Sequence, residues 1–434
     1  MSAAMNIGSM TCVMMLLAVL FKPQIKVKRF FIDTYWPIAL IGALLLVVFK
    51  SISFSEISTG LTADTAINPI KILILFISMT VLSIFLDEVG FFQYLANAVL
   101  KKAKTSQFML FAYLYITVSV LTIFTSNDII VLTFTPFICY FAKNANISAI
   151  PYLVTQFVAA NTWSLMLVIG NPTNIYLATS YGISFIEYTK VMLLPTIVAG
   201  VTAFFVLWFL FRKQLEKNIH PSIEQIKIED KPSLIIGLIH LGLCTLILVL
   251  SSYIDIEMWP VSFAFAISLF VCITISKLIQ KKKLTLLSSC IKRAPWQLVP
   301  FVISMFIIVL SLDKYGITDN IAEFFGTENV TYKYGLSSFF AANLINNIPM
   351  SVLYSSIAEN LPSTLVDKGV YSAIIGSNIG AFLTPVGALA GIMWTSILKK
   401  HEIRYTFIDF VKYGAIISIP TILASLFVLD MVLK

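Results

Sequence analysis

The sequence alternates between long apolar runs and short charged segments, and this pattern constrains the fold more than any other feature. Runs of about 17 to 25 apolar residues recur along the chain, and each can cross about 30 Å of hydrocarbon as a helix. The 434 residues are 58% hydrophobic and 12% charged, about half the charge of a typical water-soluble protein. Because the runs lack the alternation of β-strands, we expect an all-α polytopic membrane protein whose surroundings are the lipid bilayer.

Ten of these runs are expected to be full spans, five in each half of the chain. The first half has runs at 4–21, 34–49, 70–87, 148–180 and 187–211. The second half has runs at 233–251, 259–276, 296–312, 370–398 and 407–432. No basic segment precedes the first run, so we interpret it as a span and not as a signal peptide.

Two further stretches, 107–142 and 332–360, each consist of two short apolar arms around a polar tip. The arms look too short for comfortable crossings, so both stretches are interpreted as re-entrant helical hairpins. The first tip is Thr125, Ser126, Asn127 and Asp128. The second tip contains Asn346, Asn347 and Pro349.

The basic residues favour one side of this arrangement. Of the 30 Lys and Arg residues, 23 fall in segments that the span model places on the same side, and 7 fall on the other. The positive-inside rule assigns the basic side to the cytoplasm and places both termini outside the cell inner (plasma) membrane. The net charge of +8 therefore reflects membrane orientation, and no nucleic-acid partner is expected.

The chain contains an internal repeat. The stretch ISMTVLSIFLDEVG at 77–90 matches ISMFIIVLSLDKYG at 303–316, and FIEYTKVMLLPTIV at 185–198 resembles the segment 407–423. Each half has five spans, and an odd number of spans leaves the chain on the opposite side of the membrane. The second copy must therefore be inserted upside down. We expect a first transmembrane repeat at 1–211, a cytoplasmic linker at 212–232 and a second, inverted repeat at 233–434.

Each repeat also carries a span that is interrupted by residues unsuited to a continuous helix. The first interruption is Gly170, Asn171, Pro172, Thr173 and Asn174. The second includes Thr384, Pro385 and Gly387. A helix broken inside hydrocarbon leaves unpaired backbone N–H and C=O groups, so such breaks persist where they line a cavity or bind a solute. Paired interruptions in two repeats indicate the binding site of a secondary transporter.

The hairpin tips and the interruptions are expected to converge on one solute or ion site. Polar residues before the breaks join this candidate site: Asn161, Thr162, Ser377 and Asn378. Asn161 and Asn378 either line the cavity or cap a neighbouring hairpin. Prolines are expected to enforce the breaks: Pro136, Pro172, Pro349 and Pro385. Any one of them alone would more often be a simple kink.

Asp128 is the carboxylate at a predicted hairpin tip, and an ionisable group at that depth is a functional hypothesis by default. We interpret it as the candidate carrier of a coupling proton. The alternative is a structural role as an N-cap for the second hairpin arm. No cofactor is expected beyond a coupling ion, either H⁺ or Na⁺.

Enzymatic chemistry has no visible support in the sequence. The five cysteines show no metal-ligand spacing, and no Ser/His/Asp constellation or nucleotide-binding loop is present. We therefore do not expect an enzyme. A channel stays an alternative from another class.

The segment 375–422, IGSNIGAFLTPVGALAGIMW and onward, resembles the end of the arsenite/antimonite permease family, a branch of the ion transporter superfamily. The motif falls on Gly376, Asn378, Leu383, Thr384, Pro385, Gly387, Leu389, Ala390 and Trp394. The Asn-Asn-x-Pro of the second hairpin and the Phe-Thr-Ser-Asn-Asp at 124–128 resemble family motifs as well.

This resemblance implies a fold with a scaffold and a transport domain, and proton-driven efflux of arsenite, antimonite or a similar small oxyanion. It also implies a possible ATPase subunit and a possible homodimer. The stretch 160–165 lacks the acidic residue usual in the family, and 170–174 looks more like relatives that move sodium or organic anions. A sodium/proton antiporter or a sodium-coupled, dicarboxylate-like anion transporter is therefore the alternative.

Overall fold

The computed structural model describes residues 2–22, 24–27, 30–62, 68–103, 105–219, 227–254 and 256–434, and these are almost entirely helical. One small antiparallel hairpin joins β1 (Gln24–Val27) to β2 (Phe30–Asp33), with Ile25 opposite Ile32. The all-α class expected for a polytopic membrane protein is confirmed.

The helices form two series of matching order. The first series is α1 (Ser2–Phe21), α2 (Tyr35–Val48), α3 (Phe54–Thr62), α4 (Pro69–Glu88), α5 (Phe91–Ala103), α6 (Gln107–Phe124), α7 (Asn127–Asn144), α8 (Ile150–Trp163), the 3₁₀ turn η1 (Val168–Gly170), α9 (Pro172–Ser180) and α10 (Phe185–Leu215). The second series is α11 (Lys231–Ile254), α12 (Met258–Ile279), α13 (Thr285–Arg293), α14 (Leu298–Lys314), α15 (Ile317–Phe325), α16 (Val330–Ile345), α17 (Asn347–Glu359), α18 (Ser363–Gly380), the 3₁₀ turn η2 (Pro385–Gly387), α19 (Leu389–Lys400) and α20 (Phe407–Val432).

The two series pack against each other reciprocally. Helix α2 packs on α14 while α12 packs on α4, and α7 packs on α19 while α17 packs on α9. The long helices α10 and α20, which close the two series, pack side by side. Such an exchange of contacts is what two copies related by a pseudo-two-fold axis would make. The inversion of the copies in the membrane and the boundaries 1–211, 212–232 and 233–434 stay predictions.

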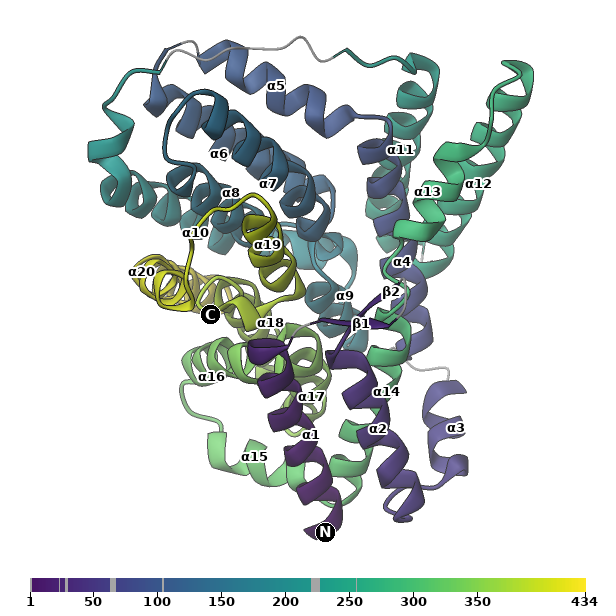
Figure 1. Cartoon of the computed structure of the whole chain (residues 1–434). Coiled ribbons are helices and arrows are strands. Elements are labelled where there is room, and N and C mark those ends of the chain that lie inside the picture. Colours follow the sequence, from purple (N-terminus) through teal and green to yellow (C-terminus); the bar gives the residue numbers. More distant parts are fainter. Residues whose placement is uncertain are drawn as a thin grey trace.

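Figure 1 shows how the helices are distributed. Helices α5 to α8 lie in the upper part of the view, α15 to α18 lie in the lower part, and α4, α11, α12 and α13 stand along one side. The second parts of the broken helices, α9 and α19, lie between the upper and lower groups. The interrupted segments therefore occupy the centre of the molecule.

Seven helical segments in the described part of the chain are long and apolar enough to cross a membrane. They are 69–88, 107–124, 185–215, 231–251, 258–279, 285–314 and 407–432. The 18-residue helix α6 is among them, so the expectation that this hairpin arm is too short to cross was wrong. The other predicted spans are shorter helices or are interrupted.

Short amphipathic helices precede or follow the spans, and they were not predicted because none of them forms a long apolar run. They are α3, α5, α13 and α15, which have 9, 13, 9 and 9 residues. In each of them the apolar residues recur with the roughly 3.6-residue period of a helix and are separated by polar residues. One of them, α13, lies in a segment whose charges look like those of an ordinary loop.

The prolines differ in their effect on the helices. Pro172 and Pro385 begin α9 and η2, and Pro349 lies in the first turn of α17, where a missing N–H costs little. Pro136 lies inside α7, which continues past it to Asn144. The expected break at Pro136 was therefore wrong, in line with the tolerance of membrane helices for internal proline.

Helices α16 and α18 cross closely because Gly376 has no side chain. A Cβ atom there would lie 2.0 Å from the Ser338 hydroxyl oxygen and 2.1 Å from the Gly335 carbonyl oxygen. Both atoms belong to α16, so a larger residue must push the two helices apart.

Gly376→Ala is expected to lower the free energy of unfolding by about 1–3 kcal/mol, the usual effect of overpacking. Thermal melting of the detergent-solubilised protein measures the change. Gly242→Ala is the matched control, since a Cβ on this α11 residue would meet nothing within 4 Å. Equal melting temperatures for the two variants would contradict the close crossing of α16 and α18.

Candidate functional site

Asn378, two residues before the end of α18, connects the two broken helices at the centre of the molecule. Its Nδ2 donates to Asn174 Oδ1 at 2.7 Å and to the Ile374 carbonyl at 2.9 Å. Its Oδ1 accepts from the Ser164 hydroxyl at 2.8 Å. Because Asn378 belongs to the second series and Asn174 and Ser164 belong to the first, these bonds join the two copies.

Asn174 satisfies backbone groups that the first break leaves without helical partners. Its Nδ2 donates to the carbonyls of Ser164 at 2.7 Å and Leu167 at 3.3 Å, just beyond the end of α8. At the other side of the break, Asn171 Oδ1 accepts from the Thr173 N–H at 3.1 Å and so caps the start of α9.

The first hairpin tip is tied to the same region. Asn127, the first residue of α7, donates through Nδ2 to Asn161 Oδ1 at 3.1 Å. Asn161 in turn donates to the Phe157 carbonyl of its own helix at 2.8 Å. Asn161 therefore accepts a hydrogen bond from the tip of the first hairpin. We call Asn127, Asn161, Ser164, Asn174 and Asn378 the asparagine cluster; all five side chains are buried.

The second hairpin uses a different set of bonds. Asn343 Nδ2 donates to the carbonyls of Phe339 at 2.8 Å and Gly380 at 3.0 Å, and its Oδ1 accepts from the Thr384 hydroxyl at 2.7 Å. Asn343 thus connects the first arm of the hairpin to the end of α18 and to the residue before η2. Asn343 and Ser164 were not predicted from the sequence, because each is a single polar residue beside an apolar arm.

The tip of the second hairpin is held in a strained conformation. Asn346 has φ 74° and ψ 154°, a region that residues other than glycine seldom adopt. Its side chain compensates, since Nδ2 donates to the Val386 carbonyl at 2.9 Å and Oδ1 accepts from the Ile348 N–H at 3.3 Å. Strain of about 1–3 kcal/mol persists only where the surroundings enforce it, often at functional sites.

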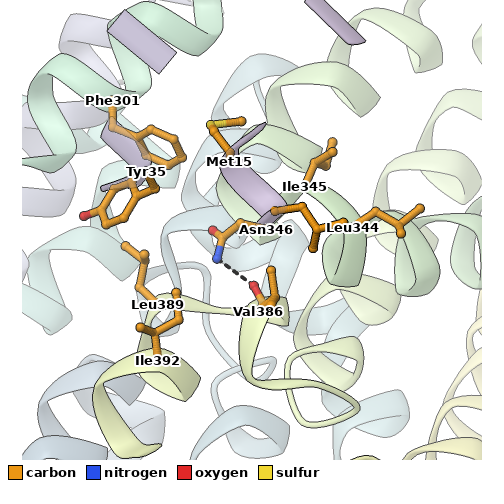
Figure 2. A pocket seen from close by; sticks show the side chains of 10 residues that line it. Met15, Tyr35, Phe301, Leu344, Ile345, Asn346, Val386, Leu389 and Ile392 are labelled. Atoms are coloured by element: carbon orange, nitrogen blue, oxygen red, sulfur yellow. Dashed lines mark hydrogen bonds between the residues drawn. The ribbon is translucent and has the colours of Figure 1, made fainter. Parts of the chain in front are cut away.

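A narrow pocket lies beside this tip. Figure 2 shows Asn346 bonded to Val386, with Tyr35 and Phe301 across the pocket. The pocket has a volume of about 10 Å³, room for about one water molecule, and a mainly apolar lining. Rings of Tyr35 and Phe301 meet edge to face at 4.8 Å, so α2 and α14 form one wall and the hairpin tip forms another.

The two breaks have the same backbone but different side chains. Leu167 (φ −122°, ψ 150°) corresponds to Thr384 (φ −136°, ψ 158°), and Asn171 (φ −150°, ψ 144°) corresponds to Ala388 (φ −149°, ψ 156°). Gly170 and Gly387 end the two 3₁₀ turns, where a Cβ would lie 2.3 Å and 2.8 Å from a backbone carbonyl oxygen.

Polar side chains at the breaks are therefore distributed unequally. The first break has Asn171, Thr173 and Asn174, and the matching positions of the second break are Ala388, Ala390 and Gly391. Both breaks have the geometry of a site, but the first supplies most of the side-chain polar atoms.

Several buried polar atoms in this region have no hydrogen-bond partner among the described residues. In the first series they are Ser126 Oγ, Asn127 Oδ1, Thr162 Oγ1, Asn171 Nδ2 and Thr173 Oγ1. In the second series they are Asn347 Oδ1 and Ser377 Oγ. A buried polar group without a partner costs about 1–3 kcal/mol, so these atoms are available to a solute or an ion.

Asp128 lies in the first turn of α7, next to Asn127, and is half-buried. Within the described residues no hydrogen bond or ion pair to its carboxylate is found. The positive end of the helix dipole favours a negative charge there. The N-cap position itself is Ser126, whose side chain makes no capping bond, so the expected alternative of Asp128 as the N-cap does not fit this geometry.

The remaining predicted site residues have local structural roles. Thr125 donates to the Leu121 carbonyl of its own helix at 2.7 Å, and Pro172, Pro349 and Pro385 begin or enter helices. Hydrogen bonds thus join the first tip to Asn161, the second tip to the second break, and the two breaks to each other. That these residues bind a solute stays a prediction.

The long apolar helices and the two hairpin-and-break units define a multi-pass membrane transporter. A model of the citrate transporter family (CitMHS) matches residues 34–369. The chain therefore belongs to this family.

Curated relatives and a solved structure agree with this class. The chain is 25% identical over 369 residues to the arsenical pump membrane protein of Escherichia coli, covering 81% of this chain and 84% of the relative. It is 24% identical over 418 residues to a putative arsenical pump membrane protein of Bacillus subtilis, covering 89% and 92%. These matches support the resemblance to arsenite permeases.

The fold is similar to that of the YdaH transporter of Alcanivorax borkumensis, whose crystal structure was described as having an unusual topology. The match has a TM-score of 0.58 and 10% identity, and it covers 99% of this chain and 98% of that chain. At this identity the likeness concerns the fold alone.

Asn378→Ala is expected to lower the free energy of unfolding by about 1–3 kcal/mol, because Asn174 Oδ1 loses its donor in a buried place. A double-mutant cycle with Asn174→Ala should give a coupling of about 1 kcal/mol. Melting temperatures of the purified variants measure both quantities.

Asn360→Ala is the control, because its bond to the Ser356 carbonyl is exposed and long, at 3.4 Å. This variant should melt like the unmodified protein. Additive effects of Asn378→Ala and Asn174→Ala would contradict the bond between the two breaks.

Proposed function

We propose that the chain is a secondary active transporter that exports a small, uncharged metalloid hydroxide, arsenite first and antimonite next, in exchange for protons. The observation that carries the proposal is the chemistry of the candidate site. Its buried unpaired atoms in the first series are neutral amide and hydroxyl groups, at Ser126, Asn127, Thr162, Asn171 and Thr173.

Charge is the argument for an uncharged solute. The candidate site includes the carboxylate of Asp128 and no Lys or Arg. A carboxylate-rich anion such as citrate would be buried there without a cation to pair with, which is costly. Trivalent arsenic hydroxide is neutral near pH 7, and its three hydroxyl groups can both donate and accept hydrogen bonds.

The names of the relatives support the same solute. The E. coli and B. subtilis relatives are described as arsenical pump membrane proteins, and they align with most of this chain. We place the chain in the inner membrane of the cell, with its basic loops in the cytoplasm. Export then moves the solute from the cytoplasmic side to the outside.

A second candidate is sodium coupling, and one specific observation favours it. Four of the five unpaired buried atoms named in the first series are oxygens that could ligate a hard cation: Ser126 Oγ, Asn127 Oδ1, Thr162 Oγ1 and Thr173 Oγ1. A sodium/proton antiporter or a sodium-coupled anion transporter would use these oxygens for the ion.

Uptake into everted membrane vesicles distinguishes the candidates. Arsenite and antimonite should accumulate under a proton gradient, and an uncoupler should abolish the accumulation. Vesicles that instead take up citrate or a dicarboxylate only with sodium would overturn the leading proposal.

Asp128→Asn tests the proton role. The variant should lose accumulation driven by the proton gradient while it still exchanges arsenite across proteoliposomes at equal pH, because the amide cannot carry the proton. Asp319→Asn is the matched control, an exposed first-turn aspartate of α15 that should keep full activity. Retention of proton-driven accumulation by Asp128→Asn would exclude Asp128 as the coupling residue.

A further inference from the structure

A buried carboxylate outside the candidate site links two helices of the first series, α4 and α7, to one helix of the second, α13. Asp87, in the last turn of α4, is 9% exposed. Its Oδ1 accepts from the Thr133 hydroxyl of α7 at 2.6 Å, and its Oδ2 accepts from Arg293 Nη2 of α13 at 2.6 Å. Arg293 Nη1 also donates to Glu88 Oε1 at 2.6 Å, so both nitrogens are used.

These elements belong to two different groups of helices. Helix α4 packs on α11, α12 and α13, which stand together along one side of the molecule (Figure 1). Helix α7 is the second arm of the first hairpin, begins at Asn127 of the asparagine cluster, and packs on α8 and α19. The bond from Thr133 to Asp87 is therefore a polar contact between the hairpin and the neighbouring group.

The second series repeats only half of this arrangement. Asp313 holds the matching position at the end of α14, but its Oδ1 accepts from Thr318 of the adjoining α15 at 2.5 Å. Its neighbour Lys314 pairs with Glu56 of α3 at 2.7 Å, as Arg293 of α13 pairs with the end of α4. The charged link to the short amphipathic helix exists in both series, whereas the link to the hairpin exists only in the first.

The sequence itself contains this difference. Thr133 lies six residues after Asn127, the first residue of α7. The residue six positions after Asn347, the first of α17, is Leu353, which has no hydroxyl group. A conformation in which the two series exchanged roles could not form the equivalent bond. The contact is therefore one-sided.

We propose that Asp87 is a positioning residue that latches the first hairpin in this conformation through Thr133. Arg293 fixes the carboxylate and ties it to α13, and the neutral hydroxyl bond of Thr133 is the part that opens when the hairpin moves. Because no counterpart exists on α17, the latch stabilises one conformation of the transporter over the other.

Cys139 offers a reporter for the position of α7. It lies on the same helix, is 4% exposed, and lines an open pocket that Lys143 and Arg404 also line. A membrane-impermeant maleimide can therefore reach the neighbourhood of the thiol but not the thiol itself while the hairpin is latched. The parent protein keeps Cys139 as its sole cysteine, with alanine at the others: Cys12, Cys244, Cys272 and Cys290.

Thr133→Val should raise the rate of Cys139 labelling in proteoliposomes by about tenfold, the effect of losing a hydrogen bond to a charged group. Thr133→Ser should label at the parent rate, because the hydroxyl is retained. The double variant Asp87→Asn with Thr133→Val should label no faster than the faster of its two single variants.

Thr135→Val is the matched control. Thr135 is a buried threonine of the same helix, but it donates to the Val131 carbonyl at 2.5 Å and to Gln156 Oε1 at 3.1 Å, with no link to α4. This control should label at the parent rate. Parent-rate labelling of Thr133→Val, or an equal rise in Thr135→Val, would overturn the latch. Since no substrate is used, this outcome is independent of the transport assays.

Discussion

The structure depends on how the interrupted helices satisfy their backbone polar groups away from water. Each unpaired N–H or C=O in hydrocarbon costs several kcal/mol, so a break at that depth needs a built-in partner. Here asparagine side chains supply it. Asn174 donates to two carbonyls at the first break, and Asn343 and Asn346 donate to carbonyls on either side of the second. These asparagines therefore have a structural role in the fold, whether or not they also bind a solute.

Much of the organisation could be predicted from the sequence, because repeats and breaks leave direct traces in it. The hairpin tips and the segments at 170–174 and 384–387 were found from turn residues inside apolar runs, and the structure has helix ends at each of them. The partners of those segments were harder to predict. Ser164 and Asn343 are isolated polar residues, and only the fold shows that they face a broken backbone.

Other features could not be read because the signal was ambiguous. Pro136 looks like a helix breaker, but α7 continues through it, since a proline kink is tolerated where neighbours pack around it. The sequence did not distinguish the helix α13 from a loop, because an amphipathic helix and a basic loop have similar compositions over nine residues. The bond from Thr133 to Asp87 joins residues 46 apart and has no local signature.

The two series share one frame and differ in chemistry. Their breaks have matching backbone angles, yet the first break has Asn171 and Thr173 where the second has Ala388 and Ala390. The second break resembles the arsenite permeases in sequence and contributes mainly backbone groups. The first break and the first hairpin tip contribute most of the unpaired side-chain atoms. Selectivity for the solute is therefore expected to depend on the first series.

Ligand-dependent stability of the purified protein tests this account most directly, because a solute that binds only the folded state raises the melting temperature once its concentration exceeds the dissociation constant. The account predicts that arsenite or antimonite stabilises the unmodified protein, that citrate does not, and that Asn127→Ala abolishes the stabilisation while the protein stays folded. Stabilisation by citrate, or by arsenite to the same extent in Asn127→Ala, would contradict it.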